Sequence, residues 1–150
     1  PKASRIKVVH LGKAHSNAAA KKAENEMRQN PRYQWKGEVS GWHVRQELGK
    51  SHLMVISSKA EGGANVISEA IVAGVPIIAS KIDGNVGLLG KKYSGYYPVG
   101  NTAELRKVIL RAETDNAFMQ SLIKQCNSIK PKFTIEREQE SWHELIKNMT

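Results

Sequence analysis

The chain has 150 residues, about the size of one domain, and 40% of them are hydrophobic, which can supply a real core. No apolar run approaches the roughly 20 residues of a membrane-spanning helix, and the single cysteine, Cys126, excludes an internal disulfide. We therefore expect a soluble protein of the reducing cytoplasm. The formal net charge of +9 favours anionic partners.

The predicted elements alternate between strands and helices. Strands are predicted at residues 5–11, 33–39 and 53–56 and near Pro76 and Tyr96, and helices at residues 16–29, 40–49, 65–75, 101–113, 116–128 and 134–149, with a short helix in the glycine-rich loop 83–90. This alternation predicts an α/β fold, a Rossmann-like parallel sheet flanked by helices with a helical C-terminal segment.

Two glutamates enclose the turn between the third strand and the helix that follows it. Glu61 precedes Gly62-Gly63, and Glu69 is the only charged residue from Gly62 to Ser80. Free amides at the start of a helix favour phosphate, and glycine lets a ligand approach the backbone. Side chains on a helix lean toward its N-terminus, so we expect Glu69 to point back toward this turn. The layout suits a ligand with central phosphates and a hydroxyl-bearing group at each end, such as a nucleoside diphosphate sugar.

This segment resembles the signature of family 4 (group 1) of the retaining glycosyltransferases, enzymes with the two-domain GT-B fold. The resemblance implies that Glu61 contacts the donor sugar as the catalytic carboxylate and that Glu69 binds the ribose hydroxyls. It also implies phosphate contacts from the backbone of Gly62, Gly63, Ala64 and Asn65. The similarity continues through residues 73–80, which resemble the family's next strand and its approach.

The site departs from the family pattern at its sugar end. The sequence Gly-Gly-Ala-Asn stands at residues 62–65 where the family usually has Gly-Phe-Gly-Leu, and the loop 83–90 lacks the glutamate that usually follows a glycine pair. We still expect Gly84 and Asn85 in this loop to bind the donor. By the same resemblance, the backbone from Gly37 to Val39 is the expected site of the nucleotide base.

A narrower resemblance is carried by Glu-Gly-Gly-Ala-Asn-Val at 61–66, Gly-Asn-Val-Gly-Leu-Leu-Gly at 84–90 and Gly-Tyr-Tyr-Pro-Val-Gly at 95–100. These segments are similar to a subgroup that includes the selenosugar synthases of selenoneine biosynthesis. The subgroup implies UDP-N-acetylglucosamine as the donor and a selenophosphate as the acceptor. The broader family leaves the base, the sugar and the acceptor open.

Against the family pattern, residues 1–150 correspond to one domain that is only part of the donor-binding half. The resemblance implies that the first strand and helix of this half, with the basic residues that grip the pyrophosphate, precede Pro1. The acceptor-binding N-terminal domain of the same chain would precede them. We therefore expect this fragment to bind a nucleotide sugar without transferring the sugar.

No cofactor or metal is expected beyond the donor itself. Only two aspartates are present, Asp83 and Asp115, so no Asp-x-Asp pair exists to hold a divalent ion against a diphosphate. The five histidines also lack zinc-ligand spacing. Metal-independent chemistry is the resulting expectation.

Two alternatives come from other functional classes. The net charge of +9 suits a nucleic-acid-binding module, but the lysines and arginines are spread along the chain without interleaved aromatic residues, so no nucleic acid is expected as a partner. A non-catalytic interaction domain with the same fold is the second alternative. The basic character also suits an acidic acceptor or peripheral association with a membrane surface.

Overall fold

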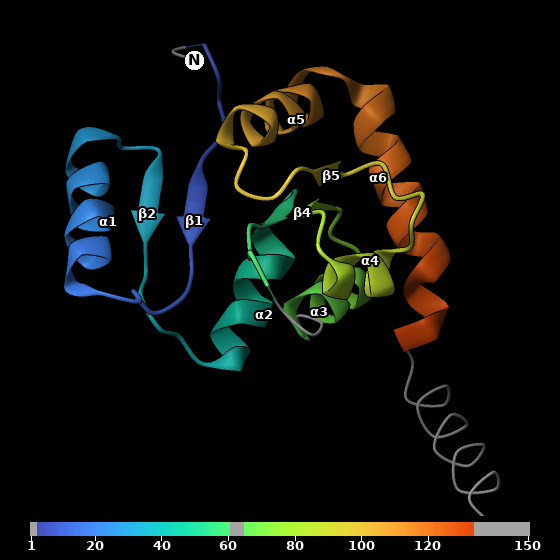
Figure 1. Cartoon of the computed structure of the whole chain (residues 1–150), viewed down its shortest axis with the longest axis horizontal. Coiled ribbons are helices and arrows are strands. Elements are labelled where there is room, and N and C mark those ends of the chain that lie inside the picture. The colour runs from blue at the N-terminus through green and yellow to red at the C-terminus, as the bar shows by residue number, and fades with distance from the viewer. Residues whose placement is uncertain (1–2, 61–64, 134–150) are drawn as a thin grey trace, which may run out of the picture. The chain divides into compact units, whose positions relative to one another are not determined.

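The computed structural model describes residues 3–60 and 65–133. The chain forms two compact units, Pro1–Glu47 and Leu48–Thr150. Each unit has its own parallel sheet, of two strands in the first unit and three in the second (Figure 1).

The first unit is a single strand, helix and strand repeat. Its elements are β1 (Val8–His10), α1 (Asn17–Gln29) and β2 (Tyr33–Trp35). The two strands are parallel neighbours with Val8 opposite Tyr33, and α1 packs along β2 (Figure 1). The hydroxyl of Ser16 accepts a hydrogen bond from the amide of Ala19 and so caps the helix start. None of the residues 3–47 is buried.

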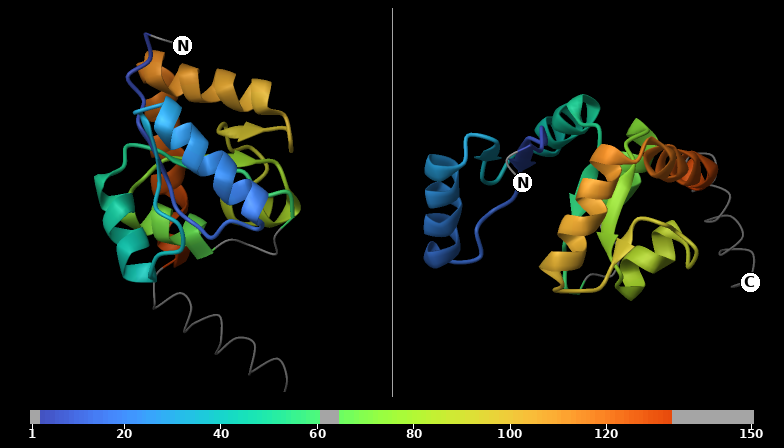
Figure 2. Two further views of the ribbon diagram at one scale, coloured as in Figure 1. Left: turned by 90° about the vertical axis from the view of Figure 1, so that its left-hand side faces the viewer. Right: turned by 90° about the horizontal axis from the view of Figure 1, so that it is seen from above.

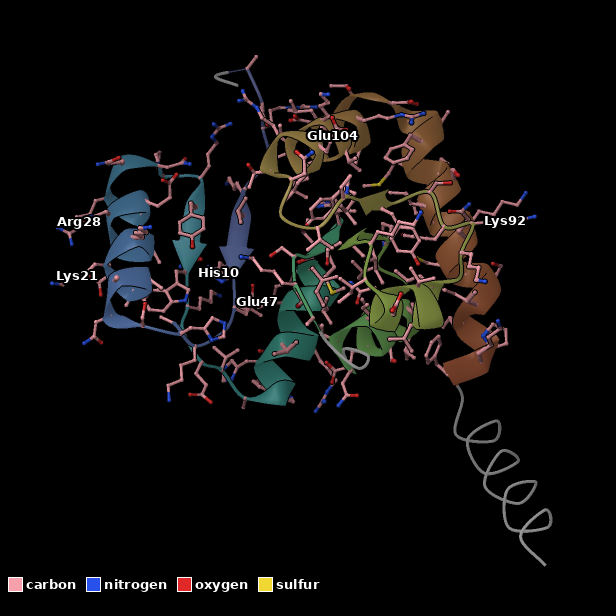
Figure 3. The ribbon with its side chains drawn as sticks, in the orientation of Figure 1. His10, Lys21, Arg28, Glu47, Lys92 and Glu104 are labelled. Atoms are coloured by element: carbon pink, nitrogen blue, oxygen red, sulfur yellow. The ribbon has the colours of Figure 1, made fainter. Side chains whose placement is uncertain are left out.

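The side of α1 away from the sheet carries exposed charges of both signs. Lys21 and Arg28 extend outward from the helix (Figure 3), and the guanidinium of Arg28 lies 3.8 Å from the carboxylate of Glu24. Because acidic and basic side chains alternate here, this side of α1 is a solvated face of mixed charge and not a uniformly basic surface.

Helix α2 (Gly41–Lys50) crosses the boundary between the two units along the chain. Ser40 precedes it, and its hydroxyl accepts a 3.5 Å hydrogen bond from the amide of His43. Leu48 is the buried residue of this helix. The predicted helix is present, and Ser40 caps its start.

The second unit is built on three parallel strands. They are β3 (Met54–Ile56), β4 (Ile77–Ser80) and β5 (Tyr96–Tyr97), in that order across the sheet. Met54 lies opposite Ile77, and Ala79 lies opposite Tyr96. Every residue of the middle strand, β4, is buried, which explains why its sequence reads as a continuous apolar run.

Helices connect and extend these strands. They are α3 (Asn65–Ala73), α4 (Asp83–Leu89), α5 (Thr102–Thr114) and α6 (Asn116–Ile129), followed by a short 3₁₀ helix, η1 (Lys130–Phe133). The side chain of Asn101 accepts a 3.0 Å hydrogen bond from the amide of Glu104 and caps α5. Asp115 ends α5 and caps α6, and the two helices meet there and run in different directions (Figure 2).

The core of the second unit lies between its sheet and helices. Its largest fully buried aliphatic side chains are those of Ile67, Ile71, Ile77, Ile78 and Leu122. The hydroxyl of Tyr93 enters this core, where it accepts a 3.1 Å hydrogen bond from the amide of Ile77 and donates a 2.5 Å hydrogen bond to the carbonyl oxygen of the same residue. One side chain thereby satisfies both polar groups at the start of β4.

The predicted α/β fold with parallel strands and connecting helices is confirmed, and the strand lengths are corrected. β1 and β2 have three residues each, where seven were predicted for each. β1 begins three residues later than predicted, at Val8, whereas β2 ends early because the chain turns at Gly37, whose φ is 66°. The helix predicted at 134–149 lies outside the described residues.

Candidate functional site

The carboxyl ends of β3 and β4 lie side by side. The strands are parallel, with Ile56 opposite Ala79, so the segments that follow them leave the same edge of the sheet. Ligands of open parallel sheets bind at this edge. The next two helices, α3 and α4, carry Glu69 and Asn85 of the predicted site.

A chain of hydrogen bonds joins the segments that follow these strands. The hydroxyl of Ser80, the last residue of β4, donates a 2.6 Å hydrogen bond to the carbonyl oxygen of Ser58. The side-chain amide of Asn85 donates to the carbonyl oxygen of Ser80 at 2.8 Å and to its hydroxyl at 3.3 Å. Ser58, Ser80 and Asn85 therefore form one polar network, called the edge network below.

Two tyrosines of β5 border this edge. Burial raises the pKa of Tyr97, and a hydrogen bond with the side chain of Ser57 lowers it in part. Burial also raises the pKa of Tyr96 to about 12. The hydroxyl of Tyr96 donates to the carbonyl oxygens of Gly90, at 3.0 Å, and Asn85, at 3.3 Å. Both tyrosines therefore stay neutral near pH 7, and Tyr96 holds α4 beside the strand.

Glu69 lies in the middle of α3. The helix buries Ile67, Ala70 and Ile71, and Glu69 is partly buried beside that apolar face. Asn65, its first residue, is exposed.

Gly84 and Asn85 lie in the first turn of α4. Gly84 is partly buried, whereas Asn85 is wholly buried. The Oδ1 atom of Asn85 is the one buried side-chain oxygen or nitrogen without a hydrogen-bond partner among residues 3–60 and 65–133. The side chain of Asn85 therefore lies beneath the edge of the sheet and not on its surface.

The residues predicted to hold the base belong to the first unit. Gly37 and Val39 follow β2 and are partly buried. The carbonyl oxygen of Gly37 accepts a 2.8 Å hydrogen bond from the amide of Gly12, and the indole of Trp35 donates a 2.9 Å hydrogen bond to the carbonyl oxygen of Gly12. The segments after β1 and β2 are thereby held together at their carboxyl ends. Glu61, Gly62, Gly63 and Ala64 lie outside the described residues.

Sequence reasoning missed Ser80 and Tyr97 as residues of this edge. Ser80 stands at the end of an otherwise apolar strand, and a polar residue in that position is the signal that could have identified it. Tyr97 gave no comparable signal, because its proximity to Ser57 depends on the order of strands in the sheet.

The sequence matches the family model described as glycosyl transferases group 1 over residues 1–128. The chain belongs to the group 1 glycosyltransferases. The α/β fold, parallel strands flanked by helices, is that of the C-terminal domain of GT-B glycosyltransferases, as predicted. The search of curated proteins finds no match.

Solved structures share this fold at low sequence identity. HepE of Anabaena, in complex with UDP and glucose, has a TM-score of 0.81 and 18% identity, over 97% of this chain and 41% of HepE. TarM of S. aureus, a point mutant in complex with UDP, fondaparinux and α-GlcNAc-glycerol, has a TM-score of 0.76 and 22% identity, over 96% of this chain and 29% of TarM. Sucrose-phosphate synthase of Thermosynechococcus elongatus has a TM-score of 0.75 and 20% identity, over 95% of this chain and 38% of the synthase. The chain thus spans less than half the length of each.

The described part of the chain offers neither a metal centre nor a membrane span. Residues 3–60 and 65–133 contain no group of three histidine, cysteine, aspartate or glutamate side chains that could hold a metal ion. No helix within the same ranges is long and apolar enough to span a bilayer.

Proposed function

We propose that the chain binds a nucleoside diphosphate sugar, a UDP-sugar, as the donor portion of a retaining family 4 glycosyltransferase. The observation that carries the proposal is the parallel pairing of β3 and β4, which puts the segments leading to Glu69 and Asn85 at one sheet edge. Membership of the group 1 family supports it, and so do the UDP complexes of HepE and TarM, two proteins of the same fold.

The residues take different parts in the proposed site. Glu69 binds the ribose hydroxyls, and the amides of residues 62–65 together with Gly84 bind the diphosphate. Glu61 acts on the sugar as the catalytic carboxylate. In the transfer step negative charge grows on the departing diphosphate and positive charge on the sugar ring. Preorganised amides and one carboxylate stabilise these two charges.

The whole reaction needs more than this chain. Because the chain spans only 29–41% of HepE, TarM and the synthase, we propose that an acceptor-binding domain completes the enzyme and that residues 1–150 bind the donor without transferring a hexosyl group. Resemblance to the selenosugar synthases makes UDP-N-acetylglucosamine the first donor to test. We further propose that transfer needs no divalent metal and takes place in the cytoplasm.

Calorimetric titration tests donor binding. UDP, GDP and UDP-N-acetylglucosamine are titrated separately into the purified protein in buffer containing EDTA. We expect saturable binding at one site, tighter for UDP than for GDP. Replacing Glu69 with alanine removes the hydrogen bonds to the ribose and weakens binding by about tenfold or more.

Controls separate the site from the fold. Glu113→Ala removes a partly buried carboxylate from the last turn of α5 and leaves affinity unchanged. Circular dichroism confirms that both variants fold. Absence of binding to the wild-type protein contradicts a donor site and favours an interaction domain, whereas affinity for single-stranded oligonucleotides that falls steeply with salt favours a nucleic-acid-binding module.

A further inference from the structure

Apart from tyrosines and Cys126, two polar residues are buried in the part of the chain that the structure describes: Ser80 ends β4, and Asn85, in the first turn of α4, bonds to it. Ser80 and Asn85 are each 0% exposed. The other end of the same strand shows how a buried polar group is satisfied here, because the Tyr93 hydroxyl there pairs with both backbone groups of Ile77. Asn85 differs, since its Oδ1 has no partner among the described residues.

The hydrogens of the edge network can be assigned by counting donors. A serine hydroxyl has one hydrogen, and Ser80 donates it to the carbonyl oxygen of Ser58 at 2.6 Å. Toward Asn85 the same hydroxyl can therefore only accept. Asn85 must present Nδ2 to Ser80, at 3.3 Å, and turn Oδ1 away. The same Nδ2 also donates to the carbonyl oxygen of Ser80 at 2.8 Å, which can only accept, so the backbone and the hydroxyl of Ser80 together set the orientation of the asparagine amide.

Stability alone does not account for this arrangement. A buried amide oxygen without a partner is unfavourable, and an apolar side chain of similar volume would avoid that loss. The bonds of Asn85 to Ser80 are also local, closing the turn into α4. The bond from Ser80 to Ser58, by contrast, joins segments 22 residues apart in the chain, the one after β3 and the one after β4.

We propose that Ser80 and Asn85 are positioning residues of the donor site, a role that rests on the proposed function. Ser80 holds the carbonyl of Ser58, and Asn85 holds Ser80 and the start of α4, so that the segments leading into α3 and α4 keep the geometry that binds the nucleotide before the nucleotide arrives. Prior ordering of this kind increases affinity because less conformational freedom is lost on binding.

The test compares hydrogen-bond deletions at the two ends of β4. Ser80→Ala removes the bond to Ser58 at the carboxyl end, and Tyr93→Phe removes the bonds to Ile77 at the other end. Both variants lose a buried hydroxyl and unfold at lower urea concentration. UDP affinity, measured by calorimetry, falls about tenfold in Ser80→Ala and stays within about twofold of wild type in Tyr93→Phe.

A second variant covers the case in which Ser80→Ala does not fold. Asn85→Leu keeps the branched shape and the number of side-chain heavy atoms and removes both bonds to Ser80, and we expect it to weaken UDP binding while its urea midpoint stays close to that of wild type. Wild-type affinity in folded Ser80→Ala or in Asn85→Leu overturns the proposal, as does an equal loss of affinity in Tyr93→Phe. Failure of the wild-type protein to bind UDP overturns the proposed function itself and the positioning role with it.

Discussion

Gly95 lies directly against the ring of Tyr93, at the point where β5 begins beside β4. A β-carbon on Gly95 would lie 2.6 Å from Cε1 of Tyr93 and 3.2 Å from a methyl carbon of Leu122, and it would also meet the carbonyl oxygen of Ile77. Because the Tyr93 ring is fixed by its hydrogen bonds to Ile77, it cannot move aside without breaking them. Absence of a side chain at position 95 is therefore a packing requirement of this sheet.

Gly95→Ala tests that requirement. We expect the substitution to lower the free energy of unfolding by about 3 kcal/mol, because an added methyl group in a closely packed core displaces its neighbours. Urea unfolding followed by circular dichroism measures the change.

Gly87→Ala is the matched control for the glycine substitution. Gly87 lies in α4, is exposed, and has no atom within 4 Å of an added β-carbon. Alanine has a higher helix propensity than glycine, so the free energy of unfolding of this variant rises by up to about 1 kcal/mol. Equal effects at positions 87 and 95 would contradict the packing argument.

The N-caps of α5 and α6 differ in their response to acid. The amide of Phe118 donates to Asp115 and, with Arg111, holds the pKa of that carboxyl below its ordinary value. A lowered folded-state pKa gives stability that is present above the unfolded value, about 3.9, and is lost as pH falls through the folded value. We expect the destabilisation by Asp115→Ala to shrink between about pH 5 and pH 2. Urea unfolding across this range measures it.

Asn101→Ala serves as the neutral comparison for the acid prediction. Asn101 caps α5 through the same side-chain bond to an amide three residues later, but it has no charge to lose. Asn101→Ala lowers the free energy of unfolding by about 1 kcal/mol, and this loss stays constant with pH. A parallel decline in both variants would show that acid weakens the helices in general and not the aspartate cap.

The partly buried phenol of Tyr96 predicts that the free energy of unfolding falls at high pH. Burial raises its pKa to about 12, so between about pH 10 and pH 12 the unfolded chain loses this proton while the folded chain keeps it. The stability from the neutral phenol is complete below the unfolded value and falls as pH rises toward 12. We expect Tyr96→Phe to lose less stability than wild type from about pH 9 to pH 11.5, measured by urea unfolding. Parallel curves would contradict the assignment.

The sequence predicts the features that depend on near neighbours. The start of α5 follows from Asn101 and Glu104, which are three residues apart. The start of α1 follows in the same way from Ser16, which caps it. The bond between Ser80 and Ser58 could not be predicted in this way, because it depends on the register of β3 against β4. The packing of Gly95 on Tyr93 depends in the same manner on strand pairing.

The candidate site was predicted in part for the same reason. The positions of Glu69 on α3 and of Gly84 and Asn85 at the start of α4 follow from strand and helix order. The complete burial of Asn85 does not follow from that order. A glycine-rich loop of this composition predicts exposed residues, and the burial becomes evident only when the packing of the strands is known.

The absence of buried residues between positions 3 and 47 has a consequence for the dynamics of the first unit. Its sheet has two strands of three residues, and Val8 and Val9 are 45% and 41% exposed. An isolated strand pair of this size is marginally stable in water. Amide hydrogens of β1 therefore exchange with solvent through small local openings, whereas those of β4, buried along its whole length, exchange only when the second unit opens.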